Sequence, residues 1–100
     1  MRDFQPCLYI LASGKRGYIY IGVTSNQAKR IYEHKSRLID GFSKRRNTNR
    51  LVHFELFGTM KLAISREKQL KNWHRDWKLN LIEAENPEWL DLAIDLGLSQ

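Results

Sequence analysis

Cysteine and long apolar runs are scarce in this chain, and each scarcity excludes a class of protein. One cysteine, Cys7, permits no disulfide within the chain, which argues against a disulfide-stabilised secreted domain. No apolar run approaches the roughly 20 residues that a membrane-spanning helix needs, and the first residues lack the apolar core of a signal peptide. We therefore expect one cytoplasmic domain over residues 1–100, without a membrane partner.

Basic residues are absent from the last part of the chain. All 17 Lys and Arg lie in residues 1–78, where six acids leave a net charge of +11, whereas residues 79–100 carry five acids and no base. A strongly basic body favours a polyanionic partner. Nucleic acid is preferred to a membrane surface because no basic helix with a broad apolar face is present. The alternative is a surface that serves solubility only.

Two short apolar runs predict a β-hairpin. Cys7–Ala12 and Tyr18–Val23 are rich in Ile, Leu, Tyr and Val, and the segment between them has the composition of a turn. Because side chains alternate along a strand, Tyr9 and Tyr20 can share one face of the sheet. Gly22 follows Tyr20 on that face without a Cβ, and we interpret the gap as a candidate pocket.

A basic helix is predicted to follow the hairpin. After three candidate N-caps in residues 24–26, apolar residues recur at helical spacing as far as Gly41; they are Ala28, Ile31, Leu38 and Ile39. Arg30, His34 and Arg37 form a stripe beside the apolar one.

A third strand and further helices are predicted downstream. Residues 51–57 alternate as a strand with three inward side chains, Val52, Phe54 and Leu56. The outward residues His53 and Glu55 are interpreted as ordinary surface residues. Residues 60–72 have a helical pattern, with Ala63, Leu70 and Trp77 recurring every seven residues.

The three tryptophans and Asn86 carry the remaining structural predictions. Trp73 and Trp77 could form a platform for bases, but we favour packing in the core. Asn86 and Pro87 have the N-cap and N1 pattern of a last helix, which includes Glu88 and Trp89 and ends near Gly97.

Glu67 conflicts with its position on the predicted helix. It lies four residues after Ala63 and three before Leu70, and so points from the apolar stripe. Burying a carboxylate is costly unless it binds a cation. Two explanations stay open, a metal ion or an ion pair with Arg30 or Lys71.

Together these features resemble the GIY-YIG nuclease family. The resemblance rests on the segments Cys7-Leu8-Tyr9 and Tyr20-Ile21-Gly22, followed by Arg30, His34 and Glu67. The first segment departs from the family's name because Cys7-Leu8 replace Gly-Ile. The resemblance implies an α/β (α+β) fold, a small three-stranded antiparallel sheet flanked by helices. It also implies a site where Tyr9, Tyr20, Arg30 and Glu67 converge on one sheet face.

The same resemblance implies a metal-dependent endonuclease that hydrolyses phosphodiester bonds in DNA, in repair or recombination. Glu67 would hold Mg²⁺ or Mn²⁺, and Arg30 would clamp the scissile phosphate. Tyr9 or Tyr20 would activate water, with His34 sharing the proton transfer. Family members also tend to have an asparagine near the metal. We expect Asn80 in that role, with Asn86 as the rival.

Basic residues outside the catalytic set are expected to contact DNA, either duplex or branched; they are Lys15, Arg16, Arg37, Lys44, Arg45 and Arg46. Two alternatives remain open. The chain could be a nucleic-acid-binding module without catalysis, or a nuclease subunit that needs a protein partner for targeting.

Overall fold

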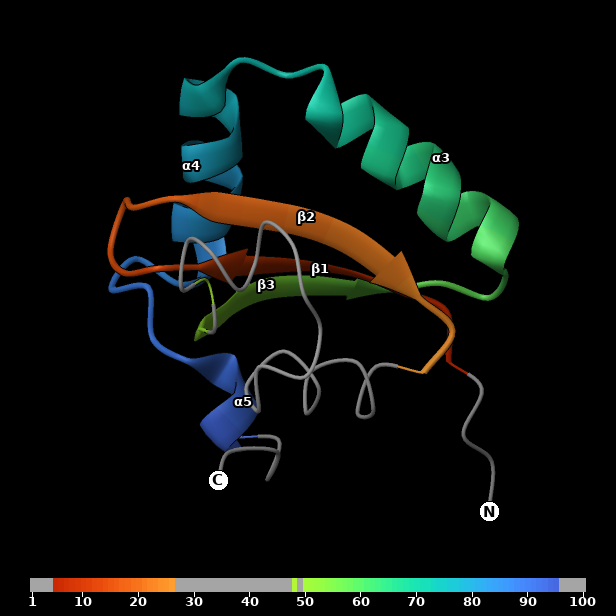
Figure 1. Ribbon diagram of the computed structural model, residues 1–100, viewed down its shortest axis with the longest axis horizontal. Helices are drawn as coiled ribbons and strands as arrows, with labels where there is room; N and C mark the ends of the chain where they lie inside the picture. The colour runs from red at the N-terminus through yellow and green to blue at the C-terminus, as the bar shows by residue number, and fades with distance from the viewer. Residues whose placement is uncertain (1–4, 27–47, 49, 96–100) are drawn as a thin grey trace.

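The computed structural model describes residues 5–26, 48 and 50–95. Within these residues the elements are, in chain order, β1 (Cys7–Ala12), β2 (Ile19–Thr24), β3 (Arg50–Leu56), α3 (Met60–Lys71), α4 (Arg75–Glu85) and α5 (Leu92–Asp95). Figure 1 shows α3 running alongside β2, whereas α5 lies next to β3. The predicted fold, a three-stranded antiparallel sheet flanked by helices, is confirmed.

β1 is the central strand, and all six of its residues are buried. A strand that is covered on both faces reads as a continuous apolar run, which explains the composition of β1. The predicted hairpin is confirmed, but β2 begins at Ile19 rather than Tyr18. Tyr18 still belongs to the turn, where its amide donates to Ser13 Oγ at 3.0 Å.

β3 departs from the predicted side-chain alternation because it carries a bulge. Ile10 pairs with His53, whereas the next residue, Leu11, pairs with Leu51. Val52 is therefore an extra residue on β3. Val52 joins the apolar cluster on one face, whereas Phe54 packs against the cluster on the other face. Leu56 is 54% exposed at the strand end. The predicted common inward set of Val52, Phe54 and Leu56 is therefore wrong.

Apolar clusters cover both faces of the sheet. The first cluster joins β1 and β3 to α3, α4 and the segment after α4; it includes Leu8, Ile10, Val52, Leu70, Leu79, Ile82 and Trp89. The second cluster joins the other face of β1 to α5; it contains Cys7, Tyr9, Leu11, Leu51 and Ala93. Tyr9 therefore lies in the second cluster, on the sheet face opposite the one that α3 and α4 cover.

The predicted helix over residues 60–72 is confirmed to within one residue as α3. Thr59 begins it, because its side chain accepts a hydrogen bond from the amide of Leu62 at 3.2 Å. The chain then turns, and a second helix, α4, starts at Arg75. Trp77 consequently lies on a different helix from α3 and is 54% exposed. The prediction that it packs in the core is wrong, whereas the half-buried Trp73 does pack against the first cluster.

The predicted helix start at Asn86 is also wrong. Asn86 is the C-cap of α4, and the next helix, α5, begins only at Leu92. Trp89 has a positive φ of 58°, a conformation that a helix interior does not tolerate. Asp91 starts α5 instead, since its carboxylate accepts from the amide of Ala93 at 3.0 Å. The predicted end near Gly97 lies outside the described residues.

Candidate active site

Tyr9 and Tyr20 lie together on one face of the sheet, as predicted. Their ring centroids are 6.3 Å apart, and the ring planes are tilted by 38°. Tyr9 lies on β1 and Tyr20 on β2. Tyr20 pairs with Leu11, which lies on the same face of β1 as Tyr9, so both rings are on one face of the sheet. Tyr9 is only 1% exposed, whereas Tyr20 is half-buried. Tyr20 is therefore the tyrosine that a substrate can reach more directly.

Gly22 does not leave a pocket, which corrects the prediction. It lies directly opposite Tyr9 in the register of β1 and β2. A Cβ built on Gly22 would lie 2.6 Å from the Tyr9 hydroxyl oxygen and 2.7 Å from Tyr9 Cζ. The missing Cβ thus makes room for the ring of Tyr9 itself. The glycine is a positioning residue for the first tyrosine.

Glu67 forms an ion pair with Lys71. The distance from Lys71 Nζ to Glu67 Oε2 is 2.9 Å, and the Glu67 side chain is 18% exposed. Of the two predicted ion-pair partners, Lys71 is thus confirmed, and Arg30 lies outside the described residues. The pair joins residues i and i+4 of α3 and leaves the Lys71 side chain 54% exposed. A metal ion at Glu67 would have to compete with this ammonium group.

α3 lies along the edge strand β2 rather than over the tyrosine face. Its Leu70 packs into the first cluster, on the sheet face opposite Tyr9. Because Arg30 lies outside the described residues, the expected convergence of Tyr9, Tyr20, Arg30 and Glu67 on one sheet face stays a prediction. Any site that combines Glu67 with the tyrosines lies at the β2 edge.

A hollow of about 320 Å³ occupies this edge. It is lined by three consecutive β2 residues and two lysines, namely Ile19, Tyr20, Ile21, Lys71 and Lys78. The hollow thus brings Tyr20 to the lysine that holds Glu67. Its two ammonium groups favour an anionic ligand.

The comparison with protein families settles what kind of domain this is. The model of the GIY-YIG catalytic domain matches residues 5–80, which hold both tyrosines, the edge hollow and Glu67. The chain belongs to the GIY-YIG family. A GIY-YIG catalytic domain indicates nuclease activity, which acts on nucleic acid.

Curated relatives of this GIY-YIG chain are UPF0213 proteins. One from Haloquadratum walsbyi is 35% identical over 83% of this chain and 91% of its own length. One from Syntrophus aciditrophicus is 37% identical over 81% of this chain and 92% of its own length. A third, from Clostridium perfringens, is 35% identical over 79% of this chain and 84% of its own length. No solved structure matches the chain significantly.

Several residues of the predicted GIY-YIG site lie outside the described residues, so their positions stay predictions; they are Arg30, His34, Arg37, Lys44, Arg45 and Arg46. The predicted helix that carries the first three, with its apolar residues from Ala28 to Ile39, lies there too.

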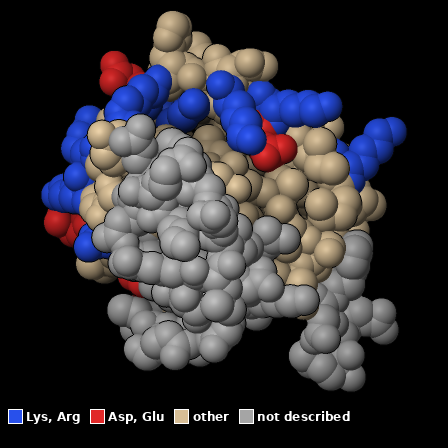
Figure 2. All heavy atoms as spheres, viewed as in Figure 1, with Lys and Arg blue, Asp and Glu red and all other residues tan. Residues whose placement is uncertain are grey.

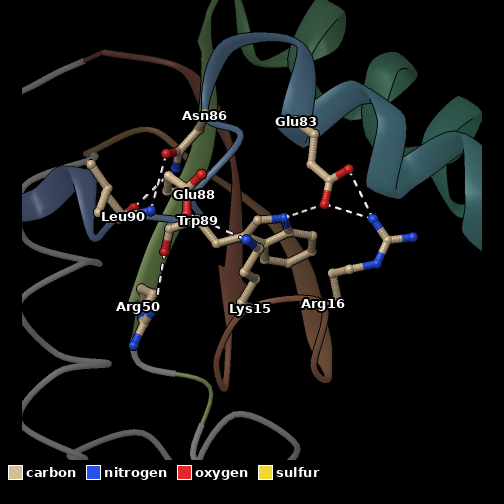
Figure 3. Close-up of polar contacts among 8 residues, drawn as sticks. All are labelled: Lys15, Arg16, Arg50, Glu83, Asn86, Glu88, Trp89 and Leu90. Atoms are coloured by element: carbon tan, nitrogen blue, oxygen red, sulfur yellow. Dashed lines mark hydrogen bonds and ion pairs between the residues drawn. The ribbon is translucent and has the colours of Figure 1, made fainter.

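Two asparagines were candidates for the site, and the structure separates them. Asn86 is 5% exposed, and its side-chain amide donates to the carbonyls of Val52 and Leu90 at 3.1 and 3.0 Å. The bond to Val52 ties the end of α4 to β3, and the bond to Leu90 is drawn in Figure 3, so Asn86 has a structural role. Asn80 is exposed on α4, so it is available for contact, and its role at the site stays a prediction.

The cysteine in the first signature of this GIY-YIG domain is a core residue. Cys7 is fully buried in the second cluster. Burial raises the pKa of its thiol to about 12, so the reactive thiolate is not populated near neutral pH. Replacing the family's glycine by Cys7 therefore adds packing and no chemistry.

The hairpin tip is exposed as predicted, but acids near its cations offset their charge (Figure 3). Arg16 Nη1 lies 2.7 Å from Glu83 Oε2, and Lys15 Nζ lies 3.3 Å from Glu88 Oε1. The hydrogen bonds that Trp89 and Arg16 donate lower the pKa of Glu83. Sequence reasoning missed these pairs because their partners are more than 60 residues apart.

His53 and Glu55 are not ordinary surface residues, which corrects the prediction. His53 is 5% exposed, and its Nε2 lies 2.9 Å from Glu55 Oε2. Arg66 of α3 donates to both carboxylate oxygens of Glu55, at 2.9 and 3.2 Å. The hydrogen bond with His53, and then those from Arg66, lower the pKa of Glu55 to about 2. Arg66 reaches from α3 to the carboxylate of Glu55 on β3, so His53 and Glu55 belong to a polar cluster rather than to an open surface.

Two observations bear on metals and membranes. Among the described residues, no group of three or more His, Cys, Asp or Glu side chains could hold a metal ion together. In the same part, no helix is both long and apolar enough to cross a membrane.

Proposed function

We propose that this protein is a metal-dependent endonuclease that hydrolyses phosphodiester bonds in DNA, in a setting such as repair or recombination. The observation that carries the proposal is the hollow at the β2 edge within a GIY-YIG catalytic domain. It brings Tyr20 together with Lys71, the partner of Glu67, and with a second cation, Lys78. A phenol, a carboxylate and positive charge are the groups that phosphoryl chemistry needs near one another.

Tyr20 is the residue we assign to proton transfer from the attacking water. Its half-buried ring lines the hollow, whereas the buried Tyr9 packs against it and positions it. Proton transfer from water during phosphoryl transfer is helped by positive charge close to the developing negative charge. Lys71 and Lys78 supply such charge, and Arg30 is proposed to add to it while it clamps the phosphate. His34 is the second candidate for the proton.

Glu67 is the residue that would hold the metal ion. A single carboxylate suits Mg²⁺, or Mn²⁺ in its place, because these ions retain several waters and need few protein ligands. The bound metal would stabilise negative charge on the phosphoryl oxygens. The ion pair with Lys71 orients the Glu67 carboxylate until the ion binds.

The test is a cleavage assay on single-stranded, duplex and branched DNA with Mg²⁺ or Mn²⁺, using the whole chain and Glu67→Gln. We expect Glu67→Gln to lose cleavage at every Mg²⁺ concentration and to bind DNA at least as well, because a negative charge is removed. An exposed i,i+4 pair is worth about 0.3–0.5 kcal/mol, so the variant should remain folded. Glu85→Gln, at an exposed carboxylate on α4, is the matched control and should cut at the parental rate.

Cleavage by Glu67→Gln at the parental rate would contradict the role of this carboxylate. If no substrate is cut but DNA is bound, the chain is a nucleic-acid-binding module without catalysis. If neither binding nor cleavage occurs until another protein is added, the chain is a nuclease subunit that needs a partner for targeting.

A further inference from the structure

The first turn of α4 exposes a large aromatic side chain that the proposed site does not use. Trp77 is 54% exposed, although indole is among the largest apolar groups that a core can bury. Its ring centroid lies 5.9 Å from that of Trp73 and 5.6 Å from that of His74, and both contacts are edge-on. We call these three residues the aromatic platform.

The platform is held in place by a chain of contacts that leads back to the sheet. The guanidinium carbon of Arg66 lies 5.4 Å from the centre of the Trp73 ring. Arg66 is itself fixed by the carboxylate of Glu55 on β3. Trp73 packs against the first apolar cluster and supports Trp77 from the core side. Trp77 is therefore preorganised, which reduces the entropy lost when a flat ligand stacks on it.

Positive charge surrounds this platform. Lys78 follows Trp77 directly, and with Lys71 it lines the hollow that contains Tyr20. Within the described residues, Lys78 makes no ion pair, and Asp76 is the acid in the same helical turn. Figure 2 shows Lys and Arg side chains gathered along the upper rim, over α3 and the beginning of α4. Exposed aromatic rings among cations are the arrangement by which proteins hold single-stranded nucleic acid.

We propose that the aromatic platform, together with Lys71 and Lys78, binds a single-stranded segment of the DNA substrate by stacking an unpaired base on Trp77. Inside a duplex the faces of the bases are covered by their neighbours, so Trp77 selects substrates with unpaired nucleotides. Lys78 and Lys71 then lead the backbone of this segment towards Tyr20 in the edge hollow. The proposal rests on the proposed function for DNA as the ligand and adds the class of substrate, DNA with a single-stranded part.

The experiment measures binding without cleavage, in EDTA. The probes are a fluorescently labelled oligo-dT of about 12 nucleotides and a blunt duplex of the same length, titrated with the whole chain, Trp77→Ala and Leu90→Ala. Leu90 is 63% exposed and lies in the acidic segment after α4, so it controls for the loss of any exposed apolar group. Stacking of one base is worth about a 5- to 150-fold change in Kd, which we expect Trp77→Ala to lose for oligo-dT. Duplex affinity should change less than about twofold.

Two further variants separate stacking from general apolar contact and from folding. Trp77→Phe keeps an aromatic face and should retain most of the affinity for oligo-dT. Trp77→Leu keeps an apolar side chain without that face and should behave like Trp77→Ala. Thermal melting shows that each variant is folded, and the Leu variant replaces the Ala variant if the latter melts early.

Oligo-dT affinity in Trp77→Ala and Trp77→Leu equal to that of the parent would overturn the proposal. Equal losses for oligo-dT and duplex, or an equal loss in Leu90→Ala, would overturn it too, because the lost contact would then not be stacking of an unpaired base on Trp77. Because binding is measured in EDTA, these outcomes do not depend on cleavage. If the chain binds oligo-dT as expected but cuts no DNA, the proposed nuclease function is contradicted and the proposed stacking site is not.

Discussion

At the scale of single residues, the position of Tyr9 depends on the residue opposite it. The ring occupies the space that a side chain at Gly22 would need, and it packs on the Tyr20 ring there. A glycine in the middle of an edge strand weakens the strand in isolation. Here the glycine is required by the neighbouring strand, since a larger residue and the tyrosine cannot share the space.

We expect Gly22→Ala to lower the free energy of unfolding by about 1–3 kcal/mol, because Tyr9 must move within a close-packed cluster. It should also lower cleavage by displacing the Tyr20 ring. The matched control is Gly58→Ala, where an added Cβ meets nothing within 4 Å. Urea unfolding of both variants measures the difference. Equal stability of the two variants would show that Tyr9 adapts without cost.

At the scale of elements, α3 is joined to the sheet by charge as well as by apolar packing. Arg66 on the helix and His53 on the strand both contact the carboxylate of Glu55. The same arginine supports Trp73, so this one polar cluster fixes the angle of α3 and the start of the aromatic platform. A polar cluster of this kind is stable only while the carboxylate remains charged.

Acid should therefore loosen this contact between α3 and β3. The pKa of Glu55 is lowered from 4.5 to about 2 in the folded protein, first by the hydrogen bond with His53. A lowered carboxyl pKa stabilises the fold above the unfolded value, and this stability is lost as the pH falls from about 4.5 towards 2. Between pH 6 and pH 3 the loss is on the order of 2 kcal/mol.

Urea unfolding at both pH values measures this loss. The free energy of unfolding should fall less between pH 6 and pH 3 in Glu55→Gln than in the parent, and the difference should be on the order of 2 kcal/mol. Glu85→Gln should retain the parental drop. If Glu55→Gln keeps the parental drop as well, another carboxylate governs the acid sensitivity.

At the scale of the whole molecule, charge is divided between two regions of the surface. Two acids that follow residue 79 in the chain lie at the hairpin tip. Glu83 pairs there with Arg16, and Glu88 pairs with Lys15. Of the cations of α3 and the start of α4, Arg66 and Lys71 pair with Glu55 and Glu67, whereas Lys61, Lys68, Arg75 and Lys78 pair with no acid within the described residues, and together they form the basic rim in Figure 2. Glu83 and Glu88 thus reduce the net positive charge at the hairpin tip. The basic rim over α3 and the start of α4 remains as the surface for a polyanion.

Binding to duplex DNA should therefore depend strongly on salt. If about five phosphates are neutralised, a plot of log affinity against log salt concentration should have a slope of about −4 to −5. Lys78→Gln should reduce the magnitude of this slope by about 1. Lys15→Gln should change it less, because Glu88 already offsets that charge. A slope near zero in the parent would exclude the electrostatic mode of binding.

Local pattern determined much of this structure in advance. The hairpin, the shared face of Tyr9 and Tyr20 and helix α3 could be predicted, because period and turn composition are properties of neighbouring residues. The GIY-YIG membership was predicted instead from the resemblance of the two tyrosine-bearing segments and the residues that follow them. At Glu67 the residues alone left a metal ion and an ion pair open, whereas the family resemblance favoured the metal ligand, and that role stays a prediction. The sequence itself contains the partner that the structure shows, Lys71, one turn away.

Tertiary structure decided what lies against each of these elements. Only the pairing of β1 with β2 shows that Tyr9 fills the space beside Gly22. Only the tertiary structure brings Arg66 of α3 to Glu55 beside the buried His53, and only the turn between α3 and α4 directs Trp77 outwards. These outcomes depend on contacts between residues far apart in the chain, and the periodicity of a single element carries no information about which neighbour will cover it.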